Sequence, residues 1–197
     1  MHYCQTCDAP HLMVPADRGA ECPVCGWIDP TARRMPLFVV TGASGAGKST
    51  LFPLLLERLS GRCLAFDVDW LIDPMKRADG EVDWESFRDA WLTIAHGAAQ
   101  NGEPVVLLSP FHPGQLDDLP ARAWVGDIHF LVLDCPDDER ERRIRARPPW
   151  RARDIEQQNA FGGWLRDHVS PVVDTAELTP DAAADAVARW IDAVLVE

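Results

Sequence analysis

The chain has 197 residues, 47% of them hydrophobic, and a formal net charge of −12 at pH 7. This length allows one ordinary domain with a small appendage, and the apolar content is sufficient for a sizeable core. The acidic balance argues against binding to nucleic acid, which needs a basic face. No apolar run approaches the roughly 20 residues of a membrane span, and the amino-terminal stretch lacks the apolar segment of a secretory signal. We therefore expect a cytoplasmic protein with no membrane partner.

The first 30 residues contain four of the six cysteines, arranged as two Cys-x-x-Cys pairs. In a reducing compartment, clustered thiols indicate a metal rather than disulfides. Four thiolates favour a closed, tetrahedral Zn²⁺ site, and so short a segment has too small a core to fold without metal. The predicted ligands are Cys4, Cys7, Cys22 and Cys25. The segment looks like a rubredoxin-type zinc ribbon, with an iron centre or a redox role as the alternative.

Residues 31–36 are predicted to be a linker, after which strands alternate with helices. Short apolar runs bounded by turn residues predict buried strands at 37–41, 63–68, 104–109, 128–134 and 169–173. Apolar residues at helical spacing and capping signals predict helices at 48–60, 83–100 and 136–147, and from 180 onward. The stretch 148–163, rich in Pro, Arg, Gln and Gly, is interpreted as a mobile excursion outside the core. This alternation predicts an α/β fold with a parallel, doubly wound sheet.

Residues 42–49 match the pattern G-x-x-x-x-G-K-[ST], between a predicted strand and a predicted helix. The glycines let backbone N–H groups turn toward phosphate oxygens, and the helix amino terminus adds the positive end of its dipole. Lys48 is expected to reach the β- and γ-phosphates, and Ser49 to hold Mg²⁺. The predicted nucleotide-binding residues are Gly42, Ala43, Ser44, Gly45, Ala46, Gly47, Lys48, Ser49 and Thr50. The Asn-Lys-x-Asp motif that reads guanine is absent from the sequence, and ATP is the expected nucleotide.

Residues 37–197 resemble the small P-loop kinases related to shikimate kinase, gluconate kinase, chloramphenicol phosphotransferase and the nucleoside monophosphate kinases. Besides the phosphate loop, three segments carry the resemblance. Phe66-Asp-Val-Asp69 is similar to the D-x-D of shikimate kinase, 133–148 resembles the helix that leads into the lid, and 173–180 resembles the segment before the last helix. The resemblance implies a three-layer P-loop NTPase fold with a five-stranded parallel sheet in the order 2-3-1-4-5.

Two carboxylates at the end of the second predicted strand are candidates for chemistry. Side chains alternate along a strand, so Asp67 and Asp69 lie on the same side, and ligands of parallel sheets bind beyond the carboxyl ends of the strands. Asp69 is predicted to accept the proton of an acceptor hydroxyl or to bind the acceptor. Asp67 is predicted to act on the Mg²⁺ shell. Lys48 and Arg147 complete the predicted catalytic set.

Arginines are concentrated from 140 to 153. The resemblance places Arg147 at the lid entrance, where a guanidinium stabilises the transferring phosphate. Arg143 shares its helical face, and Arg151 and Arg153 would lie within the lid. Arg143 and Arg151 are further predicted phosphate contacts.

The acceptor site is predicted from three residues. Arg88 lies on the helix after the second strand, where related kinases often hold an anionic acceptor. Ser109 and His112 follow the third strand and are expected to face the same crevice.

These features predict an ATP- and Mg²⁺-dependent kinase that phosphorylates a hydroxyl of a small molecule. The predicted division is a ribbon with structural Zn²⁺ at 1–30, a linker at 31–36 and a kinase domain at 37–197. One alternative is a nucleoside monophosphate kinase, whose phosphate acceptor needs no base. Another is a nucleotide-switched ATPase regulator that binds a protein partner through the ribbon. In that case Asp134, which ends a strand resembling the hhhhD strand of ATPases, would serve hydrolysis.

Overall fold

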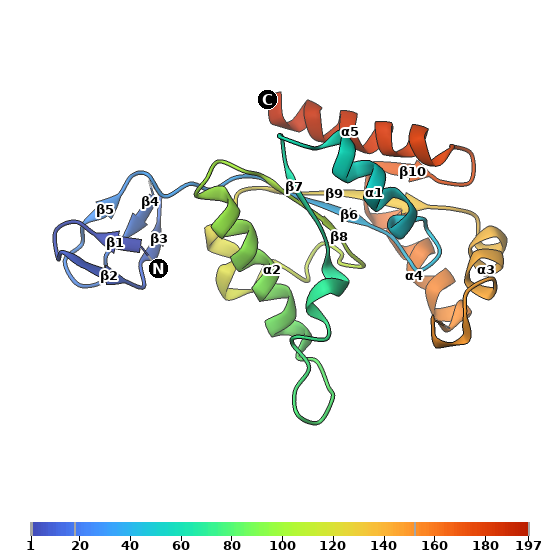
Figure 1. The fold of residues 1–197 in the computed structure, drawn as a ribbon, viewed down its shortest axis with the longest axis horizontal. Helices are drawn as coiled ribbons and strands as arrows, with labels where there is room; N and C mark the ends of the chain where they lie inside the picture. Colours follow the sequence, from blue (N-terminus) through green and yellow to red (C-terminus); the bar gives the residue numbers. More distant parts are fainter. Residues whose placement is uncertain (1, 18, 152, 197) are drawn as a thin grey trace.

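A five-stranded parallel sheet forms the centre of the α/β body (Figure 1). The computed structural model describes residues 2–17, 19–151 and 153–196. The strands are β6 (Leu37–Thr41), β7 (Leu64–Asp67), β8 (Val105–Leu108), β9 (Ile128–Asp134) and β10 (Val172–Asp174). They lie in the order β10-β9-β6-β8-β7, and every neighbouring pair is parallel. Counted from β6, this is the order 2-3-1-4-5, so the prediction from the sequence is confirmed.

Helices cover both faces of this sheet, which makes the body a three-layer structure (Figure 1). The α-helices are α1 (Lys48–Arg58), α2 (Trp84–Ala99), α3 (Asp137–Arg145), α4 (Ile155–His168) and α5 (Pro180–Val196). Three short 3₁₀ helices lie in connections: η1 (Val68–Leu71), η2 (Pro120–Trp124) and η3 (Pro149–Arg151). Within the described ranges, every helix is too short or too polar to cross a lipid bilayer.

The alternation of side chains along β6 supplies both cores. Phe38 and Val40 pack beneath α1 and α5, whereas Leu37 and Val39 pack beneath α2. All five residues of β6 are buried, as expected for a central parallel strand covered on both faces. The phosphate loop that follows β6 therefore starts from a fully buried strand.

Local signals explain the limits of α2. The Asp83 side chain accepts hydrogen bonds from the backbone N–H groups of Glu85 and Ser86, both at 3.2 Å, and so caps the first turn. Phe87 and Trp91 follow at helical spacing and are buried against the sheet. The predicted helix at 83–100 is thus confirmed.

The prediction of a mobile excursion at 148–163 is wrong, because most of this segment belongs to α4. Asp154 caps the helix by accepting a 3.0 Å hydrogen bond from the N–H of Gln157, and Leu165 is completely buried. Glycine inside a helix lowers its intrinsic stability and hid this element in the sequence. Gly162 has a steric reason to be there, since a Cβ at this position would lie 2.5 Å from Nη2 of the buried Arg140.

The position of the last strand also differs from the prediction. The helix α4 continues to His168, and Val169 then packs with Val132 and Leu165 on the sheet. The strand β10 consequently begins at Val172 rather than at residue 169.

The amino-terminal residues form a small antiparallel unit, called the ribbon below. Its strands are β1 (His2–Cys4), β2 (Ala9–His11), β3 (Val14–Ala16), β4 (Gly19–Glu21) and β5 (Ile28–Asp29). The first two form a hairpin and the other three a second sheet. The Sγ atoms of the four predicted ligands all lie within 4.8 Å of one another. Tetrahedral bonds of about 2.3 Å place thiolates about 3.8 Å apart, so the cluster has the size that Zn²⁺ requires.

The segment 31–36 has no regular structure, but it is held to the body. The Arg33 backbone exchanges two hydrogen bonds with the Gln100 side chain, and Arg34 donates a 2.6 Å bond to the backbone oxygen of Ala16 in the ribbon. Trp124 of η2 packs against the ribbon core. In Figure 1 the ribbon lies at one end of the molecule and α3 at the other.

Chelation of the metal should therefore unfold the ribbon and spare the body. Purified protein is expected to contain one Zn²⁺ per chain, because so small a core gains its folding free energy from the metal, on the order of 10–16 kcal/mol. The body has its own core, and ATP affinity should stay within about twofold of the untreated protein. Elemental analysis and ATP titration before and after chelation measure both quantities. Metal-free protein with a fully protected, folded ribbon would contradict the prediction.

Candidate active site

The loop 42–47 between β6 and α1 has the backbone conformation of a phosphate cradle. Gly45 and Gly47 have φ values of 91° and 100°, in the left-handed region that favours glycine. A Cβ on Gly45 would also lie 2.9 Å from Cγ of Arg140, so glycine is required there by contact as well as by conformation. The amino terminus of α1 follows directly, and the first N–H groups of a helix, which lack partners four residues earlier, favour anions.

A cavity of about 480 Å³ lies over this loop and the start of α1, within the size range of small-ligand sites. Its walls come from the phosphate loop, from η1, from the connection between α3 and α4, called the lid region below, and from the segment before α5. Its lining includes Ser49, Asp69, Arg143, Arg147, Arg151 and Arg153. The structure thus brings most of the predicted nucleotide-binding residues and most of the predicted catalytic residues to one cavity.

Lys48 lies against the first half of the loop. Its Nζ donates hydrogen bonds to the backbone oxygens of Gly42 and Ala43, the latter at 3.2 Å. Burial lowers the pKa of this amine to about 8, and the carboxylates of Asp69 and Asp67 oppose the shift. The residue itself is only partly buried, so we attribute the shift to the enclosed position of the amine over the loop.

Asp67 and Asp69 belong to different elements, because Asp67 ends β7 and Asp69 lies in η1. Asp67 caps η1, because its Oδ1 accepts a 3.0 Å hydrogen bond from the N–H of Asp69. Asp69 lines the cavity and keeps contact with solvent. The surrounding walls desolvate its carboxyl enough to raise the pKa, and Asp67 raises the pKa further, whereas Lys48, Arg153 and Arg151 lower it. Asp69 is therefore the acid that faces a ligand in the cavity.

Three arginines of the lid region, Arg147, Arg151 and Arg153, face the same cavity from the opposite side. Burial lowers the pKa of Arg147, and the like charges of Arg151 and Arg153 lower it further. Convergent guanidinium groups repel one another, and a polyanion between them would remove that repulsion. The arrangement is suited to binding phosphate groups.

Arg143, a predicted phosphate contact, lines the cavity, and its guanidinium also braces the loop. It donates to the backbone oxygen of Gly45 at 3.2 Å and to the hydroxyl and backbone oxygens of Thr175, both at 2.9 Å. It also pairs with Glu139 at 2.6 Å. With these partners, Arg143 joins α3, the phosphate loop and the segment after β10.

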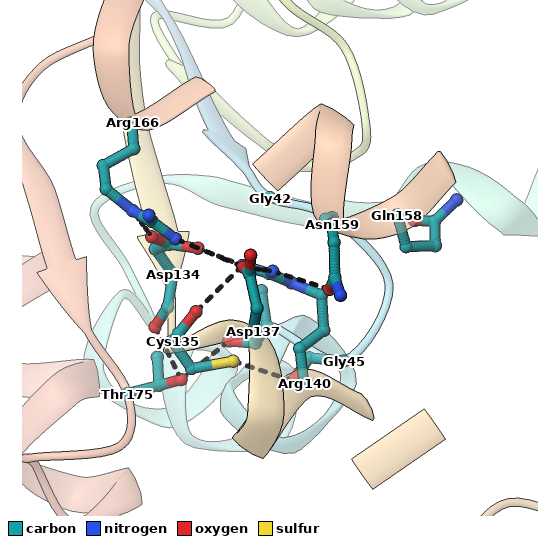
Figure 2. A network of polar contacts seen from close by, with 12 residues as sticks. Gly42, Gly45, Asp134, Cys135, Asp137, Arg140, Gln158, Asn159, Arg166 and Thr175 are labelled. Atoms are coloured by element: carbon teal, nitrogen blue, oxygen red, sulfur yellow. Dashed lines mark hydrogen bonds and ion pairs between the residues drawn. The ribbon is translucent and has the colours of Figure 1, made fainter. Parts of the chain in front are cut away.

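Sequence reasoning did not identify the most buried charge of the site, Arg140 (Figure 2). Its side chain is 0% exposed and pairs with Asp134 at the end of β9. It also donates to Asp137 at 2.5 Å, to Asn159 at 3.1 Å and to the backbone oxygen of Cys135 at 2.9 Å. The only signal in the sequence was its spacing of four residues from the buried Ile144 on one face of α3.

The acid that resembled an ATPase residue is fully engaged by this network. Oδ1 of Asp134 pairs with Arg140, and Oδ2 accepts from Nε of Arg166 at 2.5 Å (Figure 2). Both oxygens are thus bound by guanidinium groups of α3 and α4. Asp134 has a structural role in this arrangement.

The three predicted acceptor residues lie apart from the cavity. Among the residues that the structure describes, none of Arg88, Ser109 and His112 is part of its lining. The Ser109 hydroxyl is buried and accepts a 3.1 Å hydrogen bond from the N–H of Phe111, and the His112 ring packs 4.9 Å from Trp164 of α4. Among the described residues, the buried Nε of Arg88 has no hydrogen-bond partner.

Comparisons with known proteins give one family and several structural relatives. A family model described as an AAA domain matches residues 39–160. A sugar kinase from a Janibacter species has a TM-score of 0.58 and 19% identity over 81% of this chain and 95% of its own. The Deinococcus radiodurans tunicamycin resistance protein has a TM-score of 0.59 and 19% identity over 80% of this chain and 96% of its own. No curated protein matches the sequence.

A third relative has a bound nucleotide. The Mycobacterium tuberculosis APS kinase, solved with AMPPNP and APS, has a TM-score of 0.54 and 18% identity over 81% of this chain and 98% of its own. At identities of 18–19%, these likenesses establish the fold. The resemblance of residues 37–197 to the small P-loop kinases is therefore confirmed as a likeness of fold.

The lowered pKa of Lys48 predicts that ATP affinity depends on pH. Only the ammonium attracts phosphate, and with a pKa of about 8 it loses its proton as the pH rises above that value. Affinity should be nearly constant below pH 8 and should fall toward tenfold per pH unit above it. Calorimetric titration between pH 7.5 and 9.5 measures this. In Lys48→Arg, whose side chain stays charged, ATP affinity should not change with pH over this range. An equally constant affinity in the wild type would contradict the lowered pKa of Lys48.

The Arg140 network predicts a large and specific loss of stability. Arg140→Met should lower the free energy of unfolding by about 3–5 kcal/mol, because it leaves the buried Asp134 with one partner fewer. The matched control is Arg142→Met, which removes an exposed pair with Glu139 and should cost under about 1 kcal/mol. Urea denaturation of both variants gives the comparison. Equal stabilities would show that the buried pair contributes nothing beyond a surface pair.

Proposed function

The chain belongs to the AAA domain family, and we propose that it is an ATP- and Mg²⁺-dependent kinase that transfers the γ-phosphoryl group to a hydroxyl of a small molecule. One observation carries the proposal. A single cavity holds the phosphate loop with its lysine, an acid of raised pKa, and three arginines of the lid region. Phosphoryl transfer needs charge neutralisation and in-line positioning, and these are the groups that supply both.

The phosphate loop and its lysine would bind the nucleotide. The N–H groups of the loop and of the first turn of α1 hold phosphate oxygens, and the Lys48 ammonium lies at the end of the loop where the β- and γ-phosphates meet. Ser49 lines the cavity beside it and would hold Mg²⁺, with Asp67 and Asp69 nearby as oxygen donors suited to that ion. Magnesium, when bound, neutralises charge on the β- and γ-phosphates.

Asp69 would accept the proton of the acceptor hydroxyl. It is the carboxylate that lines the cavity, and its raised pKa brings it closer to the pH at which a general base is effective. Asp67 caps η1 by accepting a hydrogen bond from the backbone N–H of Asp69, and so fixes the position of the backbone from which the Asp69 carboxylate extends. The two acids of the D-x-D segment thus have separate tasks.

The lid arginines would stabilise charge that develops on the transferred group. Arg147, Arg151 and Arg153 line the cavity opposite the loop, and guanidinium groups form bidentate bonds to phosphate. Closure of the lid would also exclude water, which competes with the acceptor for the phosphoryl group.

The acceptor is proposed to be a small metabolite or antibiotic alcohol. The similar structures include a sugar kinase and an APS kinase. Arg88 of α2 would bind an anionic part of such an acceptor. Ser109 and His112 stay predictions. In the structure the Ser109 hydroxyl accepts a hydrogen bond from the N–H of Phe111, and Nδ1 of His112 contacts the backbone oxygen of Pro113. Release of ADP that depends on acceptor, measured across a panel of sugars, nucleosides and antibiotics, tests the proposal.

The alternative of an ATPase regulator has less support. Asp134, the acid that hydrolysis would use, has both carboxylate oxygens paired with arginines. The ribbon is proposed to hold structural Zn²⁺, and the protein to act in the cytoplasm. The ribbon exposes the apolar side chains of Tyr3, Leu12 and Val24. We therefore propose that it also contacts a protein partner. A regulator would show slow hydrolysis without any acceptor.

Asp69→Asn should distinguish an alcohol acceptor from a phosphate acceptor. With an alcohol, turnover should fall about 10²–10⁴-fold while ATP affinity changes little, because a general base is lost. The wild-type rate should rise with pH through a pKa above the ordinary Asp value, and this limb should vanish in the variant.

The matched control is Asp73→Asn, an exposed acid on the same segment, which should leave turnover unchanged. Steady-state kinetics with the acceptor found by the panel measure all three enzymes. Unchanged turnover in Asp69→Asn would favour the nucleoside monophosphate kinase, whose acceptor already carries the anionic oxygen.

A further inference from the structure

A side chain of α4 accepts a hydrogen bond from one of the backbone N–H groups of the phosphate loop. Oε1 of Gln158 accepts a 2.7 Å hydrogen bond from the backbone N–H of Ser44, although 114 residues separate the two in sequence. Figure 2 shows Gln158 beside the loop, on the first turns of α4. The N–H groups of such a loop are the donors that hold phosphate oxygens. A carbonyl of the protein thus takes a position where a phosphate oxygen would bind.

The position of Lys48 indicates which phosphate this would be. Its Nζ lies against the backbone oxygens of Gly42 and Ala43, so the amine covers the strand-side half of the loop. The lysine of this motif reaches the β- and γ-phosphates, whereas the helix side of the loop meets the phosphates nearer the nucleoside. Ser44 directly follows Ala43, and its N–H therefore belongs to the end that receives the terminal phosphate.

We propose that the Gln158 carbonyl is a stand-in for an oxygen of the terminal phosphate, displaced by a nucleoside triphosphate but not by a diphosphate. The inference deepens the proposed kinase function and rests on it. A triphosphate must break the bond between Ser44 and Gln158, whereas a diphosphate leaves it intact. Gln158 acts through Ser44 and is therefore a positioning residue that sets the preference between the two nucleotides.

The chemistry of the amide fits this role. A neutral amide oxygen forms a weaker hydrogen bond than a charged phosphate oxygen, by roughly a factor of two, so the γ-phosphate can displace it. The amide satisfies the Ser44 N–H at other times, and an unpaired N–H would be costly in a partly enclosed loop. A carboxylate at the same place would compete more strongly and repel the phosphate.

The same contact links the terminal phosphate to the lid. The lid arginines Arg151 and Arg153 precede α4 by only a few residues, and Gln158 lies in the first turns of this helix. The next residue, Asn159, is anchored on Arg140 by a 3.1 Å hydrogen bond. Displacement of Gln158 would therefore free the beginning of α4 and the adjoining arginines, while the rest of the helix stays fixed.

The test compares two nucleotides on four proteins. ADP and a non-hydrolysable ATP analogue, each with Mg²⁺, are titrated calorimetrically into wild type, Gln158→Ala, Gln158→Glu and Gln157→Ala. Gln158→Ala should bind the ATP analogue about two- to tenfold more tightly and ADP unchanged, because a competing hydrogen bond is removed. Gln158→Glu should bind the analogue at least about tenfold more weakly, with a smaller effect on ADP. Gln157 is its exposed neighbour on α4, and the control should match wild type.

The outcomes separate this inference from the function on which it rests. If Gln158→Ala changes both affinities equally, or neither, Gln158 is only a structural contact and the inference is wrong while the kinase proposal stands. If wild-type protein binds neither nucleotide, the proposed function fails and the inference fails with it. Thermal unfolding of each variant shows whether a common loss of affinity comes from a loosened fold, a result that would also count against the stand-in role.

Discussion

Arg140 and Asp134 form a buried ion pair beneath the phosphate loop, and the surrounding elements are arranged to accommodate it. Asp134 ends the strand next to β6, and Arg140 comes from the helix that follows. Removing two charges from water is costly, and a buried pair is tolerated only where further hydrogen bonds satisfy both groups. Here Asp137, Asn159 and the backbone oxygen of Cys135 accept hydrogen bonds from the two terminal nitrogens of the guanidinium, whereas its buried Nε has no partner among the described residues. The pair thus requires α3, α4 and the sheet to meet at one point.

Two glycines follow from the same requirement. Gly45 and Gly162 approach the Arg140 side chain so closely that a Cβ at either would overlap it. The first glycine belongs to the phosphate loop and the second to α4, so the buried arginine sets the distance between the loop and this helix. That distance in turn allows Gln158 to reach Ser44. A structural ion pair therefore determines how the lid helix contacts the phosphate site.

The charges of the cavity complement those of the nucleotide and Mg²⁺ that the proposed function requires. Arginines of the lid region face Lys48 and Asp69 across the loop, and the pKa values of both are displaced from their ordinary values by the enclosure. Perturbed titrating groups that converge in one cavity are characteristic of catalytic sites. The ribbon lies at the opposite end of the molecule (Figure 1), so the phosphate chemistry does not involve its cysteines directly.

The sequence by itself determined the parts of this protein that depend on neighbouring residues. Short contiguous patterns identified the phosphate loop, the cysteine pairs, the cap of α2 at Asp83 and the central strand at 37–41. Backbone conformation and ligand spacing impose these patterns locally. The order of the strands came from the resemblance to the small P-loop kinases and was confirmed.

Only the tertiary structure decided which polar side chains meet. The sequence shows many arginines between 140 and 153 but not that Arg140 is buried while Arg147 faces the cavity. The sequence analysis missed α4, because the glycine that weakens the helix is required by a residue of another element. The contact of Gln158 with Ser44 spans 114 residues. Such contacts depend on the packing of whole helices against the sheet, and no local pattern of residues encodes them.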